Sequence, residues 1–370
     1  MAKIRYFIRQ ETVLCIAFLA ALISCFFVPP DAEYLGYCDL RTLALLFSLM
    51  VVVAEIRKAG AFARLAHVLC ARSSGTRMLS VILVALSFFT AMLITNDVAL
   101  LTFVPFSVAV LSLAKEEKYL VRVVVLQTAA ANLGSMLTPV GNPQNIYIQS
   151  FFNLDTSEFL RVTFPVWAAS LVLLGLLCLT VGKEPVSVFL GEQPILHKKK
   201  LWLGVVLFAV CLLTVLRYLP WPVMLCVVVA ALLIFDRRTL KEADLFLLLT
   251  FVCFFVFSGN LARVEAVNNF LRGILLGREY FVSLAASQVI SNVPAALLLS
   301  GFTDNARALL LGVNVGGLGT PVASLASLIS LKLYSHSESA STARFLGEFT
   351  LVNVLLLVLL SALVCLAGMN

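Results

Sequence analysis

The sequence predicts an all-α polytopic membrane protein, and its composition and hydropathy pattern carry that prediction. Of its 370 residues, 61% are hydrophobic and only 13% are charged, and the mean hydropathy is +1.02. A soluble domain would carry about 25% charged residues. Apolar runs of about 20 residues recur along the chain, and each is long enough to cross about 30 Å of hydrocarbon. An outer-membrane barrel would instead show segments of about ten residues with alternating polarity.

Seven apolar runs are typical of single membrane crossings. They cover residues 12–29, 39–56, 162–181, 201–218, 222–236, 243–260 and 345–367. The first run follows three basic residues and ends near Cys25, which loosely resembles a lipoprotein signal. No small-residue cleavage site follows it, so a first transmembrane helix is the favoured interpretation. When the interrupted stretches described below are added to these seven runs, the chain is expected to form about nine transmembrane helices.

Two longer apolar stretches, about 78–113 and about 280–302, are interrupted by polar residues at their centres. The first contains ITNDVALL from Ile94, and the second contains ISNVPAALLL from Ile290. Both centres are too polar for one simple crossing, and the first stretch is also too long for one. We therefore expect each to form a re-entrant hairpin that enters and leaves by the same membrane face.

Two further stretches, about 119–150 and about 306–334, contain glycine and proline where a membrane helix is normally continuous. The first includes NLGSMLTPVGNPQN from Asn132, and the second includes NVGGLGTPVAS from Asn314. Non-helical backbone at membrane depth is tolerated only where it is buried in protein or lines a watery cavity. These stretches therefore predict two broken helices.

The basic residues predict how the chain is oriented. If the N-terminus is cytoplasmic and both hairpins are re-entrant, 20 of the 27 Lys and Arg residues lie on the cytoplasmic side and 7 lie outside. This places the C-terminus outside a cytoplasmic (inner) cell membrane, and residues 60–77 form a basic, amphipathic segment on the inner surface. The net charge of +7 forms no stripe on a soluble face, so nucleic acid is not an expected partner, whereas the lipid bilayer is.

Three sequence landmarks recur in the same order and indicate a duplication. DLRTLALLFSLMVVVAE from Asp39 matches DLFLLLTFVCFFVFSGN from Asp244, and both polar centres share I-[ST]-N-x-x-A. The two broken segments share N-x-G-x-x-x-T-P-V without a gap. In the charge-derived topology the matched helices run in opposite directions, so the repeat is inverted, which is the architecture of secondary transporters. The expected parts are residues 1–182 (first repeat), 183–218 (cytoplasmic linker and connecting helix) and 219–370 (second repeat).

The hairpin tips and the helix breaks are expected to meet near the membrane midplane and form a substrate or ion site. Half-helix N-termini attract anions, and unpaired carbonyls coordinate cations. A sodium ion at Asn96, Asp97 and Asn142 is one expected occupant. Simple helix packing is the alternative for such small and polar residues, including the Gly312–Gly316 spacing. The expected site residues are Thr95, Asn96, Asp97, Asn132, Gly134, Ser135, Thr138, Gly141, Asn142, Asn145, Ser291, Asn292, Asn314, Gly316, Gly317, Thr320 and Ser324.

Asp97 is the one acidic residue expected well inside the membrane region, where such residues usually have a function. It could bind a sodium ion or carry a coupling proton. The alternative is that it only caps the helix that follows the first tip. Its counterpart in the second half is Val293, so the two tips differ chemically, and one tip is expected to handle the coupling ion more than the other.

These motifs resemble the ion transporter superfamily, which contains arsenite permeases, sodium–proton antiporters, citrate transporters and divalent anion–sodium symporters. The resemblance covers nearly the whole chain and implies re-entrant hairpins with polar tips, two unwound helices and a homodimer that works by an elevator motion. The dicarboxylate symporters carry Ser-Asn-Thr at both tips, whereas this chain has Thr95-Asn96-Asp97 and Ser291-Asn292-Val293. The tips are more similar to the arsenite-permease and antiporter branch.

The expected function is secondary active transport of a small anion or oxyanion, carboxylate- or arsenite-like, coupled to sodium or protons and without another cofactor. The alternative is a sodium–proton antiporter in which Asp97 titrates.

An intramembrane enzyme is disfavoured, because His67, His197 and His336 all lie in interfacial or loop segments and no metalloprotease or nucleophile-elbow motif occurs. There is no Walker A motif, so an ATP-driven pump would need a partner subunit. Almost all nine cysteines lie in apolar runs, without metal-ligand spacing.

Overall fold

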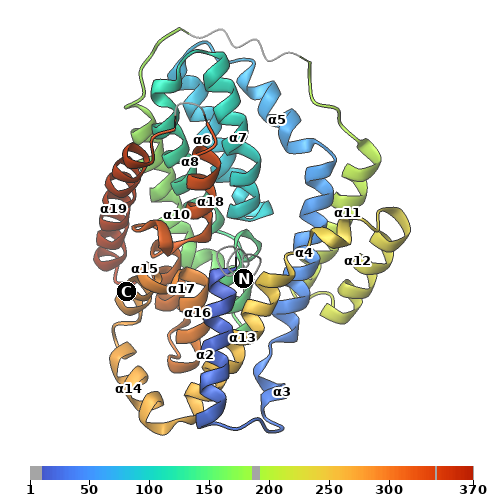
Figure 1. Ribbon diagram of the computed structural model, residues 1–370, viewed down its shortest axis with the longest axis vertical. Coiled ribbons are helices and arrows are strands. Elements are labelled where there is room, and N and C mark those ends of the chain that lie inside the picture. Colours follow the sequence, from blue (N-terminus) through green and yellow to red (C-terminus); the bar gives the residue numbers. More distant parts are fainter. Residues whose placement is uncertain (1–10, 186–191, 338–339, 370) are drawn as a thin grey trace, which may run out of the picture.

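The computed structural model describes residues 11–185, 192–337 and 340–369, and every regular element in these ranges is a helix (Figure 1). The all-α prediction is therefore confirmed. Five helices are long and apolar enough to cross a membrane: α6 (Thr76–Ile94), α7 (Asn96–Leu113), α10 (Thr156–Cys178), α13 (Leu245–Arg263) and α19 (Thr342–Leu366).

Each of the seven runs that were expected to cross the membrane forms a helix. Besides α10, α13 and α19 they are α2 (Thr12–Phe27), α4 (Leu40–Lys58), α11 (Lys198–Val215) and α12 (Trp221–Phe235). The largest difference is at α10, which begins at Thr156 rather than at residue 162. Its earlier start has a local cause, because the Asp155 carboxylate accepts a hydrogen bond from the Ser157 backbone N–H at 3.1 Å and caps the helix.

The sequence analysis missed two shorter helices, α3 (Tyr34–Tyr37) and α14 (Glu265–Leu275). Helix α14 lies at the lower end of the molecule in Figure 1. Its apolar side chains lie on one face at helical spacing, and this face is only partly covered, since Leu275 is buried while Phe270 is exposed. The amphipathic segment at residues 60–77 contains α5 (Ala61–Cys70), which lies between α4 and α6 in the chain.

Single residues in an unusual backbone conformation separate two pairs of helices. Thr95 lies between α6 and α7 with φ 71° and ψ 150°, and Ser291 lies between α15 (Glu279–Ile290) and α16 (Asn292–Leu299) with φ 73° and ψ 154°. Positive φ is uncommon for a residue with a Cβ and costs on the order of 1 kcal/mol or more. The surrounding contacts must therefore determine both turns, and the two turns have nearly the same geometry.

The two ends of each helix pair lie close together. At the α6–α7 pair, the Glu184 backbone carbonyl accepts from the Thr76 N–H at 3.0 Å. The Glu184 carboxylate accepts from Lys118 Nζ at 2.9 Å and from the Tyr119 hydroxyl at 2.6 Å, just after α7 ends. At the α15–α16 pair, Glu279 in the first turn accepts from the Thr303 hydroxyl at 3.4 Å, just after the pair ends.

The helices end where glycine and proline were expected to interrupt them. Helix α8 (Leu120–Ser135) is separated from α9 (Pro143–Phe151) by a turn of 3₁₀ helix, η2 (Pro139–Gly141). Helix α17 (Ala306–Val315) is separated from α18 (Leu325–Tyr334) by a second such turn, η5 (Pro321–Ala323). Each second segment starts from an extended residue, Asn142 or Ser324. Both breaks are thus made by the same local sequence pattern.

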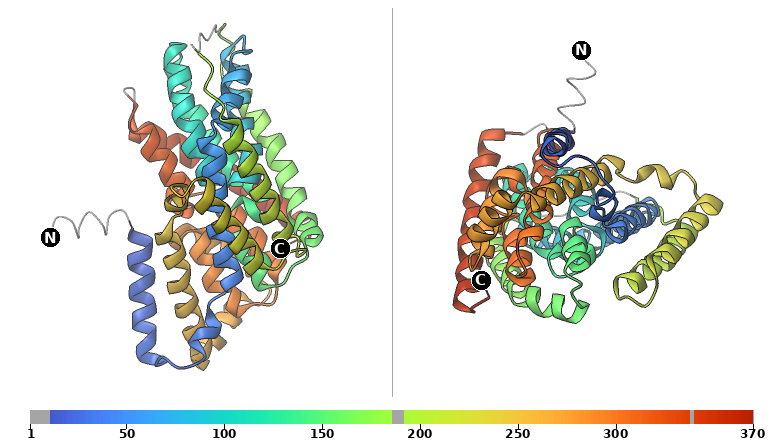
Figure 2. Two further views of the ribbon diagram at one scale, coloured as in Figure 1. Left: turned by 90° about the vertical axis from the view of Figure 1, so that its right-hand side faces the viewer. Right: turned by 90° about the horizontal axis from the view of Figure 1, so that it is seen from below.

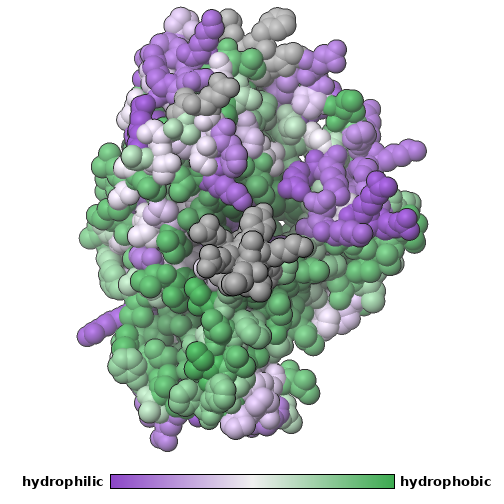
Figure 3. All heavy atoms as spheres, viewed as in Figure 1, coloured by the Kyte–Doolittle hydropathy of each residue, from purple (hydrophilic) through white to green (hydrophobic). Residues whose placement is uncertain are grey.

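Two hydrophobic cores organise the helices. One is built around α6 and α8 with α7, α10, α18 and α19, and the other around α4 and α13 with α2, α11, α12 and α16. Helix α17 joins them, since Leu311 packs in the first core and Leu310 in the second. Seen from below, α11 and α12 stand apart at the edge of the molecule (Figure 2). Apolar residues dominate the lower part of the surface in Figure 3, whereas hydrophilic residues gather at the upper end.

We expect Gly134→Ala to destabilise the protein by about 2 kcal/mol or more, because overpacking forces the backbone to shift. A Cβ at Gly134 would lie 2.0 Å from the Phe88 carbonyl oxygen, so α8 and α6 would have to separate. Gly175→Ala in α10 is the matched control, since a Cβ there has no other atom within 4 Å. Thermal unfolding in detergent measures both, and equal midpoints for the two variants would contradict the prediction.

The carboxylate of Glu184 should make stability depend on pH. Hydrogen bonds from Tyr119 and Lys118 lower the pKa of Glu184 to about 2. A lowered pKa in the folded state gives stabilisation that is complete above the unfolded value, about 4.5, and is lost as pH falls through about 2. Glu184→Gln should therefore unfold at a lower temperature than wild type at pH 7, with the gap closing in acid. Glu192→Gln, at an exposed position in the same linker, should have no such effect, and a gap that persists at pH 2 would refute the assignment.

Candidate functional site

Asparagines follow both positive-φ turns and make the same local hydrogen bond. Asn96 Oδ1 accepts from the Asp97 backbone N–H at 3.0 Å, and Asn292 Oδ1 accepts from the Val293 N–H at 2.9 Å. Each carbonyl group is therefore fixed against the first turn of the following helix. The Nδ2 group of Asn96 donates to Asn132 Oδ1 on α8 at 3.0 Å. The first tip is thus hydrogen-bonded to the first broken helix.

Asn132 connects three segments that are distant in the sequence. Its Oδ1 accepts from Asn96 and also from the Ser324 hydroxyl at 3.0 Å. Its Nδ2 donates to the Gly317 carbonyl at 3.3 Å. One side chain therefore joins the first tip, the first broken helix and the break of the second helix.

Asn314 makes the corresponding connections from the second broken helix. Its Nδ2 donates to Asn145 Oδ1 at 2.7 Å and its Oδ1 accepts from Asn142 Nδ2 at 3.1 Å. Asn142 also caps α9 by accepting from the Asn145 N–H at 3.0 Å. The Asn145 side chain donates to three carbonyls in the first break, of which the Thr138 carbonyl is nearest at 3.0 Å. The carbonyls of the first break are thus paired with the Asn145 side chain, which Asn314 of the second broken helix holds in place.

These residues form one buried asparagine network. None of its five amides is more than 5% exposed, although apolar cores surround them. Buried amides need hydrogen-bond partners, and a satisfied network of this kind fixes a unique arrangement. The members of the asparagine network are Asn96, Asn132, Asn142, Asn145 and Asn314, and Ser135 links Asn132 to Asn142. Asn292 is also buried and lies beside Gly317, but its side chain bonds the Val293 N–H.

Some of the expected site residues have other surroundings. Thr320 is exposed and bonds Gln288, through its N–H at 2.9 Å and its hydroxyl at 3.1 Å. The Thr138 hydroxyl donates to the Met92 carbonyl at 2.5 Å, and the Ser291 hydroxyl donates to the Ala323 carbonyl at 3.4 Å. The Thr138 bond attaches the first break to α6, which precedes the first tip. The Thr320 and Ser291 bonds attach the second break to α15 and to the second tip that follows it.

The remaining expected site residues allow close approach of backbone or extend the network. A Cβ on Gly141 would lie 2.0 Å from the Ser135 carbonyl oxygen, and a Cβ on Gly317 would lie 2.9 Å from Asn292 Nδ2. Gly316 is similarly crowded, with the Gly312 carbonyl oxygen 2.6 Å from an added Cβ. Ser135 donates its hydroxyl to the Asn132 carbonyl at 2.9 Å. The glycines thus permit the network to assemble.

Two cavities adjoin the first tip. A small cavity of about 10 Å³ lies between the tips and is lined in part by Asn96, Asp97, Asn292 and Ser324. It is about large enough for one water molecule. A larger cavity of about 210 Å³, which we call the acidic cavity, is lined in part by Thr95, Asp97 and Asp244. Asp97 therefore borders both.

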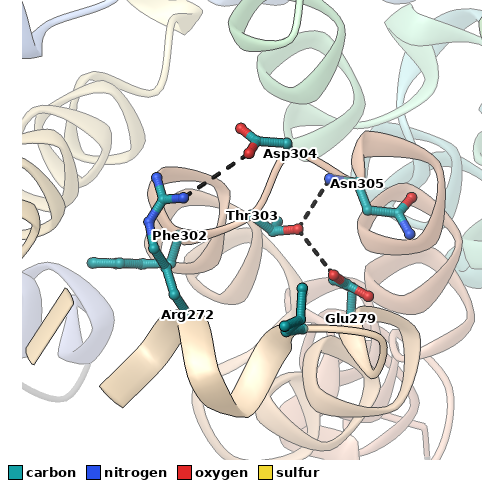
Figure 4. A pocket seen from close by; sticks show the side chains of 7 residues that line it. Arg272, Glu279, Phe302, Thr303, Asp304 and Asn305 are labelled. Carbon is teal, nitrogen blue, oxygen red and sulfur yellow. Dashed lines mark hydrogen bonds and ion pairs between the residues drawn. The ribbon is translucent and has the colours of Figure 1, made fainter. Parts of the chain in front are cut away.

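A third cavity, of about 470 Å³, lies away from the tips (Figure 4). Its labelled residues include Arg272 in the last turn of α14, Glu279 in the first turn of α15, and Asp304 before α17. None of the expected site residues lines it. It therefore belongs to the base of the α15–α16 pair and not to the asparagine network.

Asp97 makes no capping hydrogen bond in the structure. No side chain caps α7, and Asp97 Oδ1 is buried without a hydrogen-bond partner among the described residues. The capping alternative is therefore not observed. The three residues expected around sodium do not share one cavity, since Asn142 lines neither the small cavity nor the acidic cavity.

The electrostatics of the small cavity are unusual for an anion site. Among its lining residues there is no Lys, Arg or His, and Asp97 is acidic. Within the described part of the chain, no group of three or more His, Cys, Asp and Glu side chains could hold a metal ion. The polar groups available to a solute are thus neutral amides and hydroxyls together with one carboxylate.

Sequence reasoning missed two residues that the structure brings to this region. Asp244 served only as a landmark of the repeat, yet it lines the acidic cavity with Asp97. Gln288 donates to the Gly316 carbonyl at 2.7 Å and the Leu318 carbonyl at 3.0 Å, and so satisfies the second break. A glutamine in an apolar helix is a signal that could have identified this role.

Comparison with known proteins adds independent information. The sequence matches the citrate transporter (CitMHS) family over residues 6–308. An uncharacterised transporter of Methanocaldococcus jannaschii is 31% identical over 334 residues, which is 89% of this chain and 90% of that protein. Inner membrane protein YbiR of Escherichia coli is 31% identical over 314 residues, covering 83% and 84%. A silicon efflux transporter of Oryza sativa is 34% identical over 163 residues, covering 43% of this chain and 33% of that protein.

We expect Asn314→Leu to destabilise the protein by about 2–4 kcal/mol, because it removes the donor to the buried Asn145 Oδ1 and one of the two acceptors of Asn142 Nδ2. Asn353→Leu in α19 makes the same chemical change at a buried site where the amide bonds only its own helix, to the Phe349 carbonyl at 2.9 Å. That control should be nearly neutral. Thermal unfolding in detergent compares them, and a small effect for both variants would mean that the network does not hold the breaks together.

Proposed function

Since the chain belongs to the citrate transporter family of membrane transporters, we propose that it is a secondary active transporter of a small anion or oxyanion. The coupling ion is sodium or a proton, and the membrane is the cytoplasmic membrane, as for the related inner membrane protein. The observation that carries this proposal is the buried asparagine network, because it joins the first tip to both helix breaks, while the Ser291 hydroxyl bonds the second tip to the second break. A packing role alone would not require broken backbone in two separate helices.

The helix pairs α6–α7 and α15–α16 act as re-entrant hairpins in this proposal. Support comes from Glu184 and Glu279, each of which contacts the beginning of one pair and the segment just after its end. A pair that begins and ends at one place enters and leaves a membrane by the same face.

An inverted repeat is supported by equivalent contacts in the two halves. Asp39 caps α4 through the Thr42 N–H at 3.0 Å, and Asp244 caps α13 through the Leu247 N–H at 2.9 Å. At the same sequence offset, Glu55 and Asn260 are both buried and both bond a neighbouring element. Glu55 accepts from the Thr239 hydroxyl at 2.7 Å, and Asn260 donates to the Ser24 hydroxyl at 2.9 Å.

The proposed sidedness has a cytoplasmic N-terminus and an external C-terminus. Support comes from the ion pairs, which join residues that the charge pattern assigns to the same side. Cytoplasmic examples are Lys58–Glu242 at 3.1 Å and Lys200–Asp236 at 2.5 Å. External examples are Arg263–Asp31 at 2.7 Å and Arg307–Glu158 at 2.8 Å. We further propose a homodimer with an elevator motion, which rests on the resemblance to the superfamily.

The small cavity holds about one water molecule, so the tips would have to separate to admit a solute. Its lining favours a small solute that is rich in oxygen and is bound by amides, hydroxyls and helix N-termini. No cationic side chain lines the cavity to pair with the charges of a tricarboxylate. An arsenite- or silicate-like oxyacid meets this requirement better than citrate, and one relative is a silicon efflux transporter. The alternative function, a sodium–proton antiporter with Asp97 as the titrating group, is favoured by the unpaired Asp97 Oδ1.

The test is uptake into proteoliposomes of arsenite, silicate, citrate, succinate and sulfate, with imposed sodium or proton gradients. We expect gradient-driven uptake of at least one small oxyacid by the wild-type protein. Asp97→Asn should lower that uptake by at least about tenfold, since the coupling cation loses its charged ligand. If no solute moves while sodium and protons exchange, the antiporter alternative replaces this proposal.

Asp155→Asn is the control for this measurement. Asp155 caps α10 at the surface, and asparagine is an equally good cap, so transport should be unchanged. If Asp97→Asn keeps both the uptake rate and its dependence on the gradient, Asp97 has no role in the transport mechanism.

A further inference from the structure

The acidic cavity lies between two groups of helices and not inside one of them. Its walls come from α4 and α13 on one side, and from α7, α9 and α18 on the other. Its volume of about 210 Å³ is several times that of one water molecule. Asp97 belongs to the α7 wall, and Asp244 caps α13 in the opposite wall.

Three groups in these walls have oxygen atoms that bond no other residue in the described part of the chain. Asp97 Oδ1 is buried and makes no hydrogen bond among the described residues. Asp244 uses Oδ1 to accept from the Leu247 N–H, which leaves its second carboxylate oxygen uncommitted. The Thr95 hydroxyl lines the same cavity, and no side-chain cap bond forms at Thr95.

The other charged groups around the cavity do not neutralise these aspartates. Arg57 and Lys58 on α4 pair with Glu242, at 3.2 and 3.1 Å, and so bind a different carboxylate. Glu11 also lies close enough to Asp244 to add negative charge. Arg57 lines the cavity too, but its guanidinium pairs with Glu242, and Asp244 is exposed. The buried Asp97 Oδ1 therefore has no cationic partner among the described residues, which is unfavourable, and a bound cation relieves that cost.

We propose that Thr95, Asp97 and Asp244 form a sodium site in the acidic cavity. Sodium is a hard cation and takes oxygen ligands, which these two carboxylates and one hydroxyl supply, with water filling the remaining space. The site differs from the expected set of Asn96, Asp97 and Asn142, since it uses the side of the tip that faces α13. The inference rests on the proposed function and deepens it by naming the coupling ion and its ligands.

The corresponding region of the second half lacks the features of this site. The position that matches Asp97 is Val293, so that tip has no carboxylate. The positions that match Leu46, Leu49 and Met50 of the cavity wall are phenylalanines, and all three are buried. They are Phe251, Phe254 and Phe255.

Tyr147 fills further space in that second region. It matches Ile329 of the cavity wall, its ring lies 5.6 Å from that of Phe255, and its hydroxyl lies 2.6 Å from the Ser300 hydroxyl. The chain thus has room and charge for a cation beside one tip, and aromatic side chains beside the other.

The location of the site explains how an ion could be coupled to a solute. Asp97 borders both the acidic cavity and the small cavity between the tips, so the ion would lie next to the proposed solute position. Because Asp244 is on α13, a shared ion also links the tip to the α4–α13 core. Loss of the ion would leave two like charges opposing each other across that contact.

Thermal unfolding of the purified protein in detergent tests the site without a known solute. Sodium chloride is compared with choline chloride and potassium chloride at equal ionic strength and pH 7.5. We expect sodium to raise the wild-type midpoint by about 3 °C or more, because a ligand that binds only the folded state stabilises it. Asp97→Asn and Asp244→Asn should each abolish the rise.

Asp39→Asn is the matched control for Asp244→Asn. Both aspartates cap a helix, asparagine caps equally well, and Asp39 does not line the acidic cavity. The control should keep the full sodium effect. If Asp97→Asn does not fold, Asp244→Asn decides the question alone.

A wild-type midpoint that does not respond to sodium, or an equal rise in Asp244→Asn, would overturn the site. An equal rise with potassium, or a rise with falling pH but not with sodium, would do the same.

Proteoliposome uptake separates this result from the proposed function. Proton-driven uptake without a sodium effect overturns the site and leaves the transporter, whereas a sodium effect that Asp244→Asn removes supports the site even if no tested solute moves.

Discussion

The hydrogen bonds of the asparagine network are the interaction on which the rest of the structure depends. Breaking a helix at membrane depth leaves backbone groups unpaired, and each such group costs several kcal/mol in hydrocarbon. Asn145 satisfies carbonyls in the first break, and Asn132 satisfies the Gly317 carbonyl in the second. Asn145 is itself held by Asn314 of the second broken helix, and Asn132 belongs to the first, so neither break is fully satisfied without the other broken helix.

Close backbone packing brings the network together. Gly134 lets α8 lie against Phe88 of α6, and Gly312 lets α17 lie against Tyr280 and Ser283 of α15. In both halves a broken helix therefore contacts the helix that leads to a tip. This geometry explains why Asn96 reaches Asn132, and why the positive φ of Thr95 and Ser291 is tolerated.

The turns at Thr95 and Ser291 have nearly the same backbone geometry, but the residues around them differ in chemistry. Asp97 faces a cavity bounded by Leu46, Leu49 and Met50, whereas Val293 belongs to a region packed with aromatic rings. In the proposed repeat, one tip thus has a cavity beside it where a cation fits, and the space beside the other tip is filled by side chains. Directional coupling needs such a difference, since two identical tips would treat ion and solute alike.

The sequence by itself determined the helices, the seven apolar runs and both breaks, because hydropathy and the conformational limits of glycine and proline act locally. It also identified the asparagines of the network, since polar amides in apolar segments need partners. Only the tertiary structure decided which atoms pair, that Thr320 faces outward, and that Asp97 makes no cap but shares a cavity with Asp244. These outcomes depend on how helices from different parts of the chain pack, and a single sequence contains no direct record of those distances.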